Sequence, residues 1–269
     1  MSTSNIVTLT TDFGISDPYT GMMKGVILSI NPKARLIDIS HMVKAGSINH
    51  AADIIRDTFS FFPSGTIHIV VVDPGVGSKR RLIGIEAEGH FFIGPDNGIF
   101  WPVVNDFKGT KIIHLTDKKY FRPMPSPTFH GREIFAPVAA HLSLGVDLAS
   151  MGQKINDPVK LESPAAYEKD GILYGQIVHV DHFGNLISNI YNAKLKGFLK
   201  SSGLTIEVGN LIIKKLDNIY SDVEKGELLA FINSSDLLEI AVHLSRASEY
   251  LETGPAEIIG TQVKIRKLL

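Results

Sequence analysis

Residues 66–77 read Thr-Ile-His-Ile-Val-Val-Val-Asp-Pro-Gly-Val-Gly, a nearly continuous apolar and β-branched run that ends in a polar turn. Such a run is typical of a strand buried on both faces of a parallel sheet, because helices cover both sides of that kind of sheet. Segments of strand and of helix periodicity alternate before and after it. The pattern predicts an α/β domain with a mostly parallel sheet over residues 1–150.

The elements of this domain follow from periodicity and from their flanking residues. The helix expected over 47–62 has apolar residues at helical spacing, Ser47 in the N-cap position and Pro63 directly after its last turn. The other predicted elements are strands at 6–10, 35–39, 66–72, 82–87, 90–93 and 111–115, and helices at 20–30, 98–106 and 133–144.

A change in the pattern of apolar and turn residues separates this domain from a second one. Residues 151–170 carry Gly152, Pro158 and Pro164 and show no periodicity, so we expect a linker there. Short β-rich runs then alternate with turn residues, at 171–180, 186–190, 204–208, 211–214, 228–232, 237–242 and 262–267. This pattern predicts a smaller, β-rich and barrel-like C-terminal domain over residues 171–269.

Composition narrows the function. The chain has 269 residues, 27 Lys and Arg against 28 Asp and Glu, and no Cys. The lack of Cys excludes disulfides, thiolate nucleophiles and zinc-thiolate sites. A formal net charge of −1 argues against nucleic acid as a partner, since no basic excess is present to neutralise phosphates. No apolar run approaches the roughly 20 residues that span a bilayer, and the first residues do not read as a signal peptide. We therefore expect a cytoplasmic protein with no membrane partner.

Polar groups follow the predicted strands of the first domain. Asp12, Asp73 and Asp96 come directly after strands, and His130 precedes the last predicted helix. Ligands of open parallel sheets bind beyond the carboxyl ends of the strands, so these groups are candidates for one site. Each of them also suits a turn or a helix cap. The same four residues are the ones that a metal-dependent phosphoesterase would use, and that alternative stays open.

A second polar cluster lies in the C-terminal domain, where residues 181–185 read Asp-His-Phe-Gly-Asn. An aromatic ring can stack on a planar base, and an Asn side chain carries both a donor and an acceptor, which suits the edge of adenine. A β-turn between two strands explains the Gly-Asn pair equally well.

Six motifs occur in order along nearly the whole chain, and together they resemble the S-adenosyl-L-methionine (SAM) hydroxide adenosyltransferases, which are related to fluorinating and chlorinating enzymes. The motifs are Thr11-Asp12-Phe13-Gly14, Asp73-Pro74-Gly75-Val76-Gly77, Pro95-Asp96-Asn97-Gly98, His130-Gly131-Arg132-Glu133-Ile134-Phe135-Ala136-Pro137, Phe183-Gly184-Asn185 and Asn233-Ser234. The resemblance implies hydrolysis of SAM to adenosine and L-methionine, with SAM as the substrate and with no cofactor and no metal. It also implies a homotrimer whose active sites lie between subunits.

The resemblance places a catalytic triad on Asp73, Arg80 and His130. The halogenating relatives have Tyr at the Asp position and lack the His, so this sequence points to water rather than halide as the nucleophile. Arg80 stays protonated at neutral pH and would act as a fixed positive charge. His130 is the residue that would most naturally take a proton near pH 7, although the sequence leaves the proton acceptor open.

By the same resemblance, seven other positions would contact the substrate: Asp12 at the ribose hydroxyls, Asp17 and Asp181 near the methionine end, Phe183 and Tyr220 on the two faces of adenine, Asn185 at its edge, and Ser234 at the methionine carboxylate. The halogenating enzymes have an Arg where this chain has Ser235, so the resemblance leaves open how the carboxylate is held. Two further readings stay open: a non-catalytic protein that binds SAM or adenosine, and an adenosyltransferase that uses halide.

Overall fold

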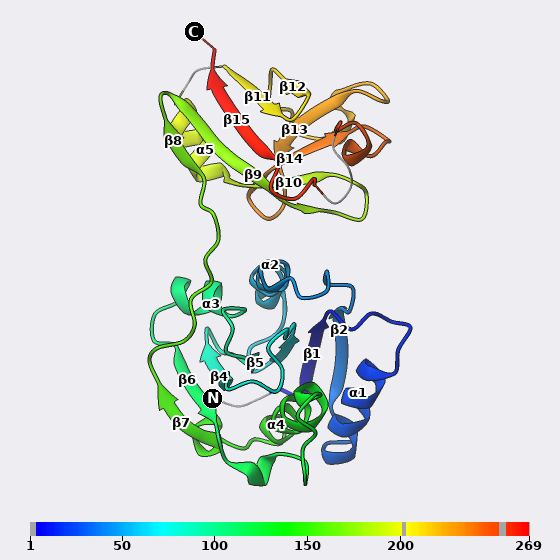
Figure 1. The fold of residues 1–269 in the computed structure, drawn as a ribbon, viewed down its shortest axis with the longest axis vertical. Helices are drawn as coiled ribbons and strands as arrows, with labels where there is room; N and C mark the ends of the chain where they lie inside the picture. The colour runs from blue at the N-terminus through cyan, green and yellow to red at the C-terminus, as the bar shows by residue number, and fades with distance from the viewer. Residues whose placement is uncertain (1–3, 201–202, 253–256, 269) are drawn as a thin grey trace. The chain divides into compact units, whose positions relative to one another are not determined.

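The computed structural model describes residues 4–200, 203–252 and 257–268. The chain divides into two compact units, Met1–Glu162 and Ser163–Leu269, each with its own sheet (Figure 1). The first unit alternates strands and helices, and the second consists mainly of strands, as the sequence predicted. No helix within the described ranges is both long enough and apolar enough to cross a membrane.

The first unit is built on a seven-stranded sheet with the order β2-β1-β3-β5-β4-β6-β7. Its strands are β1 (Ile6–Thr11), β2 (Arg35–Ser40), β3 (Ile67–Val71), β4 (Leu82–Ala87), β5 (His90–Pro95), β6 (Lys111–Leu115) and β7 (Gly152–Ile155). Strands β2, β1, β3 and β5 pair in parallel, whereas β4, β6 and β7 pair antiparallel with their neighbours. Five strands therefore point the same way, and the sheet is mostly parallel as predicted.

Helices cover both faces of this sheet (Figure 1). They are α1 (Tyr19–Ile30), α2 (Ile48–Thr58), α3 (Trp101–Asp106) and α4 (Ala136–Ser143). The pair α1 and α4 shares one apolar core with the sheet, and the pair α2 and α3 shares the other. The pairs therefore lie on opposite faces.

Strand β3 shows why the sequence around it is apolar without interruption. Ile67 and Ile69 belong to the core under α1 and α4, while Val70 and Val72 belong to the core under α2 and α3. Each of these four side chains is fully buried. A strand with helices on both sides must be apolar on both faces, which confirms the prediction made from residues 66–72.

The helix predicted over 47–62 begins as expected and ends earlier. Ser47 is its N-cap, and its hydroxyl accepts a hydrogen bond from the backbone N–H of His50 at 3.4 Å. The α-helix ends at Thr58, and a 3₁₀ turn at Phe59–Phe61 carries the chain to Pro63. The tighter turn is common where a helix ends before proline.

The helix predicted over 133–144 is two elements, a π-helical turn at Gly131–Phe135 followed by α4. Pro137 accounts for part of this, because it has no N–H to donate to the carbonyl of Glu133 four residues earlier. That carbonyl instead accepts the backbone N–H of Arg122 at 2.9 Å. The exchange ties the 121–123 segment to the turn that follows His130.

Residues 151–170 are not a structureless linker throughout. Strand β7 (Gly152–Ile155) pairs with β6 at the edge of the first sheet, and β8 (Tyr167–Lys169) pairs with β9 in the second. Gly152 fits there because a Cβ atom would approach the carbonyl oxygen of His114 to 1.9 Å. Four-residue and three-residue edge strands are too short to show periodicity in sequence.

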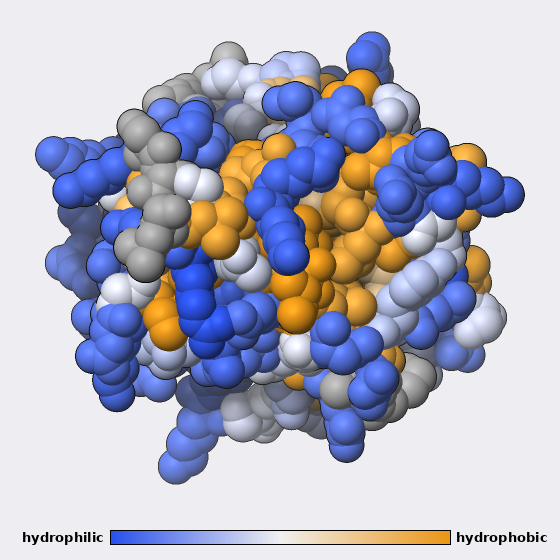
Figure 2. Space-filling model, turned by 90° about the horizontal axis from the view of Figure 1, so that it is seen from above, coloured by the Kyte–Doolittle hydropathy of each residue, from blue (hydrophilic) through white to orange (hydrophobic). Residues whose placement is uncertain are grey.

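The second unit is an antiparallel sheet with the order β12-β11-β15-β9-β10-β14-β13 and with β8 added to β9. Its elements are β9 (Ile172–Val180), β10 (Leu186–Tyr191), α5 (Asn192–Leu199), β11 (Leu204–Val208), β12 (Leu211–Ile213), β13 (Leu228–Ile232), β14 (Leu237–Val242) and β15 (Gln262–Lys267). The edge strands β12 and β13 also contact each other, so the sheet is nearly a closed barrel. Figure 2 looks onto this unit and shows apolar side chains between hydrophilic ones at the surface.

Candidate active site

Two of the carboxylates that follow the parallel strands line one cavity of the first unit. Asp12 comes directly after β1, and Asp73 comes two residues after β3. Together with His130 they line a cavity of about 600 Å³. Ligand pockets for small molecules commonly measure roughly 300–1,000 Å³, so the cavity is large enough for such a ligand. The rest of the lining comes from Phe13, Tyr19, Gly46, Val71, Pro74, Val76, Ser126, Thr128, Phe129, Gly131 and Arg132.

Asp73, Arg80 and His130 form a single hydrogen-bonded group at this cavity. The Nε atom of Arg80 donates to Asp73 Oδ1 at 2.6 Å, and its Nη2 atom donates to Asp73 Oδ2. The same Nη2 atom lies 2.8 Å from Nδ1 of His130. The side chains of Asp73 and Arg80 are 5% and 9% exposed. Two parallel charge-assisted bonds in a buried position hold the guanidinium in one orientation.

The proton positions on His130 follow from its partner. A guanidinium has donors only, so the Nδ1 atom of His130 must accept the bond from Arg80. The ring is then neutral and carries its single hydrogen on Nε2. Burial, helped by the positive charge of Arg80, lowers the pKa of His130 below its usual value, which agrees with a neutral ring at pH 7. His130 thus presents a donor while Arg80 occupies its other nitrogen.

The turn between Asp73 and Arg80 explains why the two residues are seven positions apart. Backbone bonds from Val76 N to the Asp73 carbonyl and from Ser78 N to the Gly75 carbonyl fold the segment back on itself. Gly77 has φ +80°, and a Cβ atom there would lie 2.9 Å from the carbonyl oxygen of Pro127. Only glycine combines this conformation with so close an approach. The loop therefore returns Arg80 to Asp73.

Asp12 is held at the same edge by the backbone. Its Oδ2 atom accepts the N–H of Gly46 at 2.8 Å, and Oδ1 takes no part in that bond. Asp17, in contrast, is exposed in the turn between β1 and α1 and does not line the cavity. The first unit thus brings together four of its predicted residues, Asp12, Asp73, Arg80 and His130, and leaves Asp17 apart from them.

An aromatic wall and one cation were not predicted from the sequence. The rings of Phe13, Tyr19 and Phe129 pack edge to face, with centroids 5.5–5.9 Å apart. Arg132 lies over Phe129 at 5.0 Å, and its Nε atom donates to Glu133 Oε1 at 2.7 Å. In the sequence, Phe13 and Phe129 are adjacent to Asp12 and His130, and this adjacency could have indicated that they belong to the site. Hydrophobic periodicity assigns such aromatic residues to the core instead.

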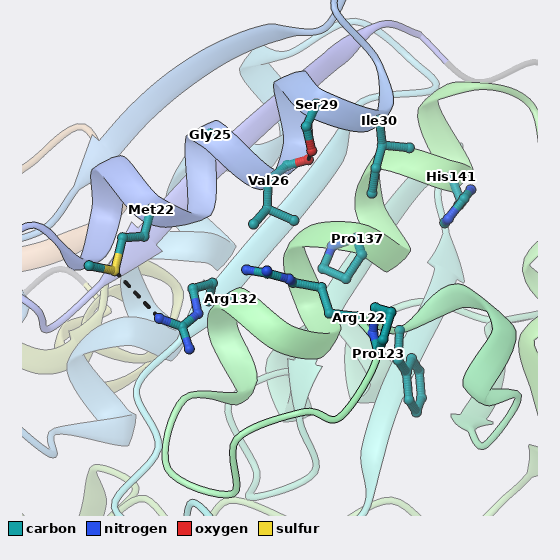
Figure 3. Close-up of a pocket in the computed structure, with 11 residues that line it drawn as sticks. Met22, Gly25, Val26, Ser29, Ile30, Arg122, Pro123, Arg132, Pro137 and His141 are labelled. Atoms are coloured by element: carbon teal, nitrogen blue, oxygen red, sulfur yellow. Dashed lines mark hydrogen bonds between the residues drawn. The ribbon is translucent and has the colours of Figure 1, made fainter.

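A second cavity of about 560 Å³ also has Arg132 in its lining (Figure 3). Met22, Val26 and Ile30 of α1 line it from one side, and Arg122 and the prolines at 123 and 137 line it from the other. None of the residues predicted from the sequence is part of this lining, so the site is assigned to the first cavity.

Asp96 is used differently from the other strand-end carboxylates. It is 4% exposed, and its Oδ2 atom accepts from Arg81 Nε at 2.7 Å while its Oδ1 atom accepts from the backbone N–H of Val159 at 2.9 Å. It therefore anchors the returning chain and does not line the cavity. Among the residues that the structure describes, no three His, Asp or Glu side chains are grouped so that they could hold a metal ion.

The second unit brings three of its predicted residues together. The Nδ2 atom of Asn185 donates to Asp181 Oδ2 and to the Tyr220 hydroxyl, each at 3.1 Å. The Tyr220 hydroxyl donates to Glu239 Oε1 at 2.9 Å. Burial, together with the nearby Glu239 carboxylate, raises the pKa of Tyr220 to about 12, so the phenol keeps its proton. Glu239 was not predicted as a site residue. The sequence feature that could have indicated its role is a carboxylate within the otherwise apolar strand β14.

The two other predicted residues of this unit lie at its surface. Phe183 is 70% exposed, and Ser234 is exposed in the turn between β13 and β14. An exposed aromatic ring on a turn is available for stacking on a ligand. Neither residue is tied into the hydrogen bonds around Asn185.

Fold and cavity define the class first: a two-unit protein whose α/β unit carries an Asp–Arg–His group at the carboxyl edge of its parallel strands. Comparison of the sequence with family models then identifies the family. The SAM hydroxide adenosyltransferase N-terminal domain matches residues 7–152, and the C-terminal domain of the same family matches residues 175–259. The chain belongs to the SAM hydroxide adenosyltransferase family, as its motifs indicated.

Named relatives and solved structures cover nearly the whole chain. An (R)-S-adenosyl-L-methionine hydrolase of Methanocaldococcus jannaschii is 35% identical, over 92% of each chain. One from Salinispora arenicola is 32% identical, over 96% of this chain and 97% of the relative. A fluorinase of Actinoplanes sp. is 26% identical, over 88% and 90% of the two chains. The crystal structure of an uncharacterized conserved protein from Thermotoga maritima superposes with a TM-score of 0.88 at 33% identity and covers 97% of this chain and 99% of that one.

Proposed function

We propose that this protein is a SAM hydrolase that releases adenosine and L-methionine. The observation that carries the proposal is the hydrogen-bonded Asp73–Arg80–His130 group, which sits at a cavity of suitable size in a chain of this family. Family membership and the named hydrolase relatives support the substrate. The finer assignment of residues to roles is part of the proposal.

The reaction is a displacement at the ribose 5′ carbon. The oxygen of water forms a bond to C5′ while the bond between C5′ and the sulfonium sulfur breaks, and the electron pair of that bond passes to sulfur. Methionine leaves as a neutral thioether and needs no acid. Water is a very weak acid, so activating the nucleophile is the demanding part. One proton of the water must be removed as the bond forms.

The hydrogen bonds support different roles for the three side chains. Arg80 directs its Nε and Nη2 donors to Asp73 and His130 and does not line the cavity, so its role is to position the other two. Asp73 and His130 do line it. The Nε2–H group of His130 can donate to the attacking oxygen, and the Asp73 carboxylate can accept the water proton. In this arrangement His130 is not the base, which differs from the expectation drawn from the sequence.

Substrate binding completes the proposal. Asp12 would accept hydrogen bonds from the ribose hydroxyls, Phe183 and Tyr220 would stack on adenine, and Asn185 would bond its edge. Asp17 and Asp181 would lie near the methionine end, and Ser234 near its carboxylate. Holding the reacting atoms in line can contribute about 7–11 kcal/mol to lowering the barrier. The scheme uses no cofactor and routes no step through a metal.

We also propose that the chain acts as a cytoplasmic homotrimer, with each active site formed by the first unit of one subunit and the second unit of a neighbour. The support is the resemblance to trimeric enzymes of this family. Sedimentation should then give about 88 kDa, three times the mass of one chain. Refolding a His130→Ala chain together with a Phe183→Ala, Asn185→Ala chain should restore part of the activity. A fully active monomer would contradict this assembly.

Product analysis tests the proposed reaction. The protein is incubated with SAM in buffers with and without fluoride or chloride, and the products are separated by chromatography. We expect adenosine and L-methionine in equal amounts under all conditions, with no dependence on halide. A halogenated 5′-deoxyadenosine would support the halide-using alternative. Tight binding of SAM with no product would support a binding protein.

A further inference from the structure

The hydrogen bonds around Asn185 fix which atom of its side chain is available to a ligand. The group consists of Asp181, Asn185, Tyr220, Asn233 and Glu239, and we call it the Asn185 network. Asn185 itself is only 3% exposed. Both N–H groups of its amide are used inside the network, one toward Asp181 Oδ2 and one toward the Tyr220 hydroxyl. No hydrogen bond of the network involves the remaining polar atom of this amide, Oδ1.

The orientation of this amide follows from its partners. The Asp181 carboxylate only accepts hydrogen bonds, so the atom that faces it must be the amide nitrogen. Tyr220 leads to the same result, because its hydroxyl proton goes to the Glu239 carboxylate at 2.9 Å. The phenol oxygen can then only accept from Asn185. Two independent acceptors thus set the same orientation.

The far end of the network is fixed by the backbone. The Oδ1 atom of Asn233 accepts the N–H groups of Ser235 at 3.0 Å and of Leu237 at 3.1 Å. Its amide nitrogen must therefore face Glu239, and it donates to Oε2 at 3.1 Å. Glu239 is 4% exposed, and its two oxygens accept hydrogen bonds inside the unit, Oε1 from Tyr220 and Oε2 from Asn233. The donor and the acceptor of each hydrogen bond between the 233–237 turn and Asn185 are thereby fixed.

We propose that Glu239, acting through Tyr220, is a positioning residue that holds the Oδ1 atom of Asn185 toward the purine and makes the site select a 6-amino purine over a 6-oxo purine. This inference rests on the proposed function, which supplies the adenine. A 6-amino group donates a hydrogen bond to Oδ1. A 6-oxo group is itself an acceptor, so two oxygens would face each other without a proton between them, and such an unpaired buried contact is costly.

A single substitution reverses part of the network. In Glu239→Gln, the fixed nitrogen of Asn233 requires the oxygen of the new amide at its side, so the nitrogen of that amide must face Tyr220. The Tyr220 hydroxyl then accepts from this nitrogen, and its proton, no longer bound to a carboxylate, can be donated to the Oδ1 atom of a turned Asn185 amide. One of the two constraints on Asn185 is thereby removed. Adding Asp181→Asn reverses the second constraint, because Oδ1 at position 181 accepts the backbone N–H of Asn185 at 2.8 Å and the nitrogen of the new amide must then face the Asn185 side chain.

The test is the ratio of Kd for inosine to Kd for adenosine, measured by calorimetry on the full chain. We expect the parent protein to prefer adenosine by about a hundredfold, since sites built around one polar group discriminate strongly. Glu239→Gln should lower that ratio about tenfold, and the Asp181→Asn, Glu239→Gln double variant should bring it to unity or below. Glu207→Gln is the matched control, because that carboxylate pairs with Arg266 on another strand of the same unit. It should keep the parent ratio.

Separate readouts distinguish positioning from general damage. At saturating SAM, kcat of Glu239→Gln should stay within about twofold of the parent, because the network does not include the triad. If that variant does not fold, Tyr220→Phe should also lower the ratio, since it removes one of the two acceptors. A parent protein that binds inosine and adenosine equally, or a parent-like ratio in folded Glu239→Gln, would overturn the inference. Discrimination without any SAM hydrolysis would contradict the proposed function alone.

Discussion

The two units use polar residues in opposite ways. In the first, Asp73, Arg80 and His130 form a charged group whose internal bonds leave a carboxylate and an N–H donor at a cavity. In the second, Asn185 uses both of its donors internally and keeps one carbonyl oxygen aside. The first arrangement suits the activation of a nucleophile, and the second suits the recognition of a ligand edge. In each unit, the hydrogen-bonding capacity that remains after the internal bonds indicates what the group can do for a ligand.

The largest expected effect comes from breaking the charged group. Asp73→Asn, Arg80→Ala and His130→Ala should each lower kcat by about a thousandfold, because acid–base groups contribute on the order of 10²–10⁴. SAM binding should change by only a few-fold, and a double variant should lose little more than a single one, because the residues act as a unit. Single-turnover rates and calorimetric Kd values separate these quantities. Full activity in Asp73→Asn and His130→Ala would end the triad assignment.

A smaller effect is expected for Asp12, which in the proposed site binds the substrate and takes no part in the reaction. Asp12→Ala should weaken SAM and adenosine together, by about 1.5–3 kcal/mol, since charged hydrogen bonds to two hydroxyls are lost. 2′,3′-Dideoxyadenosine, which lacks those hydroxyls, should bind the parent and the variant equally. Parent-like adenosine binding by Asp12→Ala would remove this residue from the ribose site.

The pH dependence of turnover sharpens the role of His130. Its pKa lies below the usual value of 6.5, so the neutral ring that accepts from Arg80 persists at pH 7 and above. As the pH falls through that lowered pKa, protonation of Nδ1 breaks the bond, and kcat should fall up to about tenfold per pH unit. In His130→Gln, the remaining activity should lack this acid limb. A limb that persists in that variant would belong to another group.

A further difference between the units concerns their stability in acid. His68 is fully buried between Thr8 and His90, and burial lowers the pKa of His68 to about 3. The unfolded state binds the proton near pH 6.5, whereas the folded state does so only near pH 3. The contribution of neutral His68 to the stability of the first unit is therefore complete above pH 6.5 and is lost as the pH falls. At pH 5.5 the free energy of unfolding should be about 1.4 kcal/mol smaller. Denaturant unfolding at several pH values, followed by hydrogen exchange in each unit, measures this.

The second unit provides the control for that measurement. Burial also lowers the pKa of His179, but that side chain is half-buried, whereas His68 is fully buried. We therefore expect the first unit to lose protection before the second between pH 6.5 and 4. Simultaneous loss in both units, or no loss at all, would contradict the role given to His68.

The sequence predicted what depends on periodicity and on strand ends. The run at 66–72, the alternation of elements and the position of Asp73 after a strand follow from burial on both faces of a parallel sheet. The π-helical turn after His130 was missed because it depends on the missing N–H of Pro137 and a tertiary bond from Arg122. Asp96 resembles Asp73 in sequence, and its bonds to Arg81 and to the backbone N–H of Val159 make it structural. Glu239 was missed because its partners are distant in sequence.

The most direct test of the account follows the oxygen atom of the nucleophile. SAM is incubated with the protein in oxygen-18 water, and the adenosine formed is examined by mass spectrometry. The account predicts one labelled oxygen, located at the 5′ hydroxyl, in adenosine from the parent protein. It also predicts almost no adenosine from Asp73→Asn in the same time. Unlabelled adenosine, or equal product from the variant, would contradict the claim that the first unit directs water to the ribose 5′ carbon.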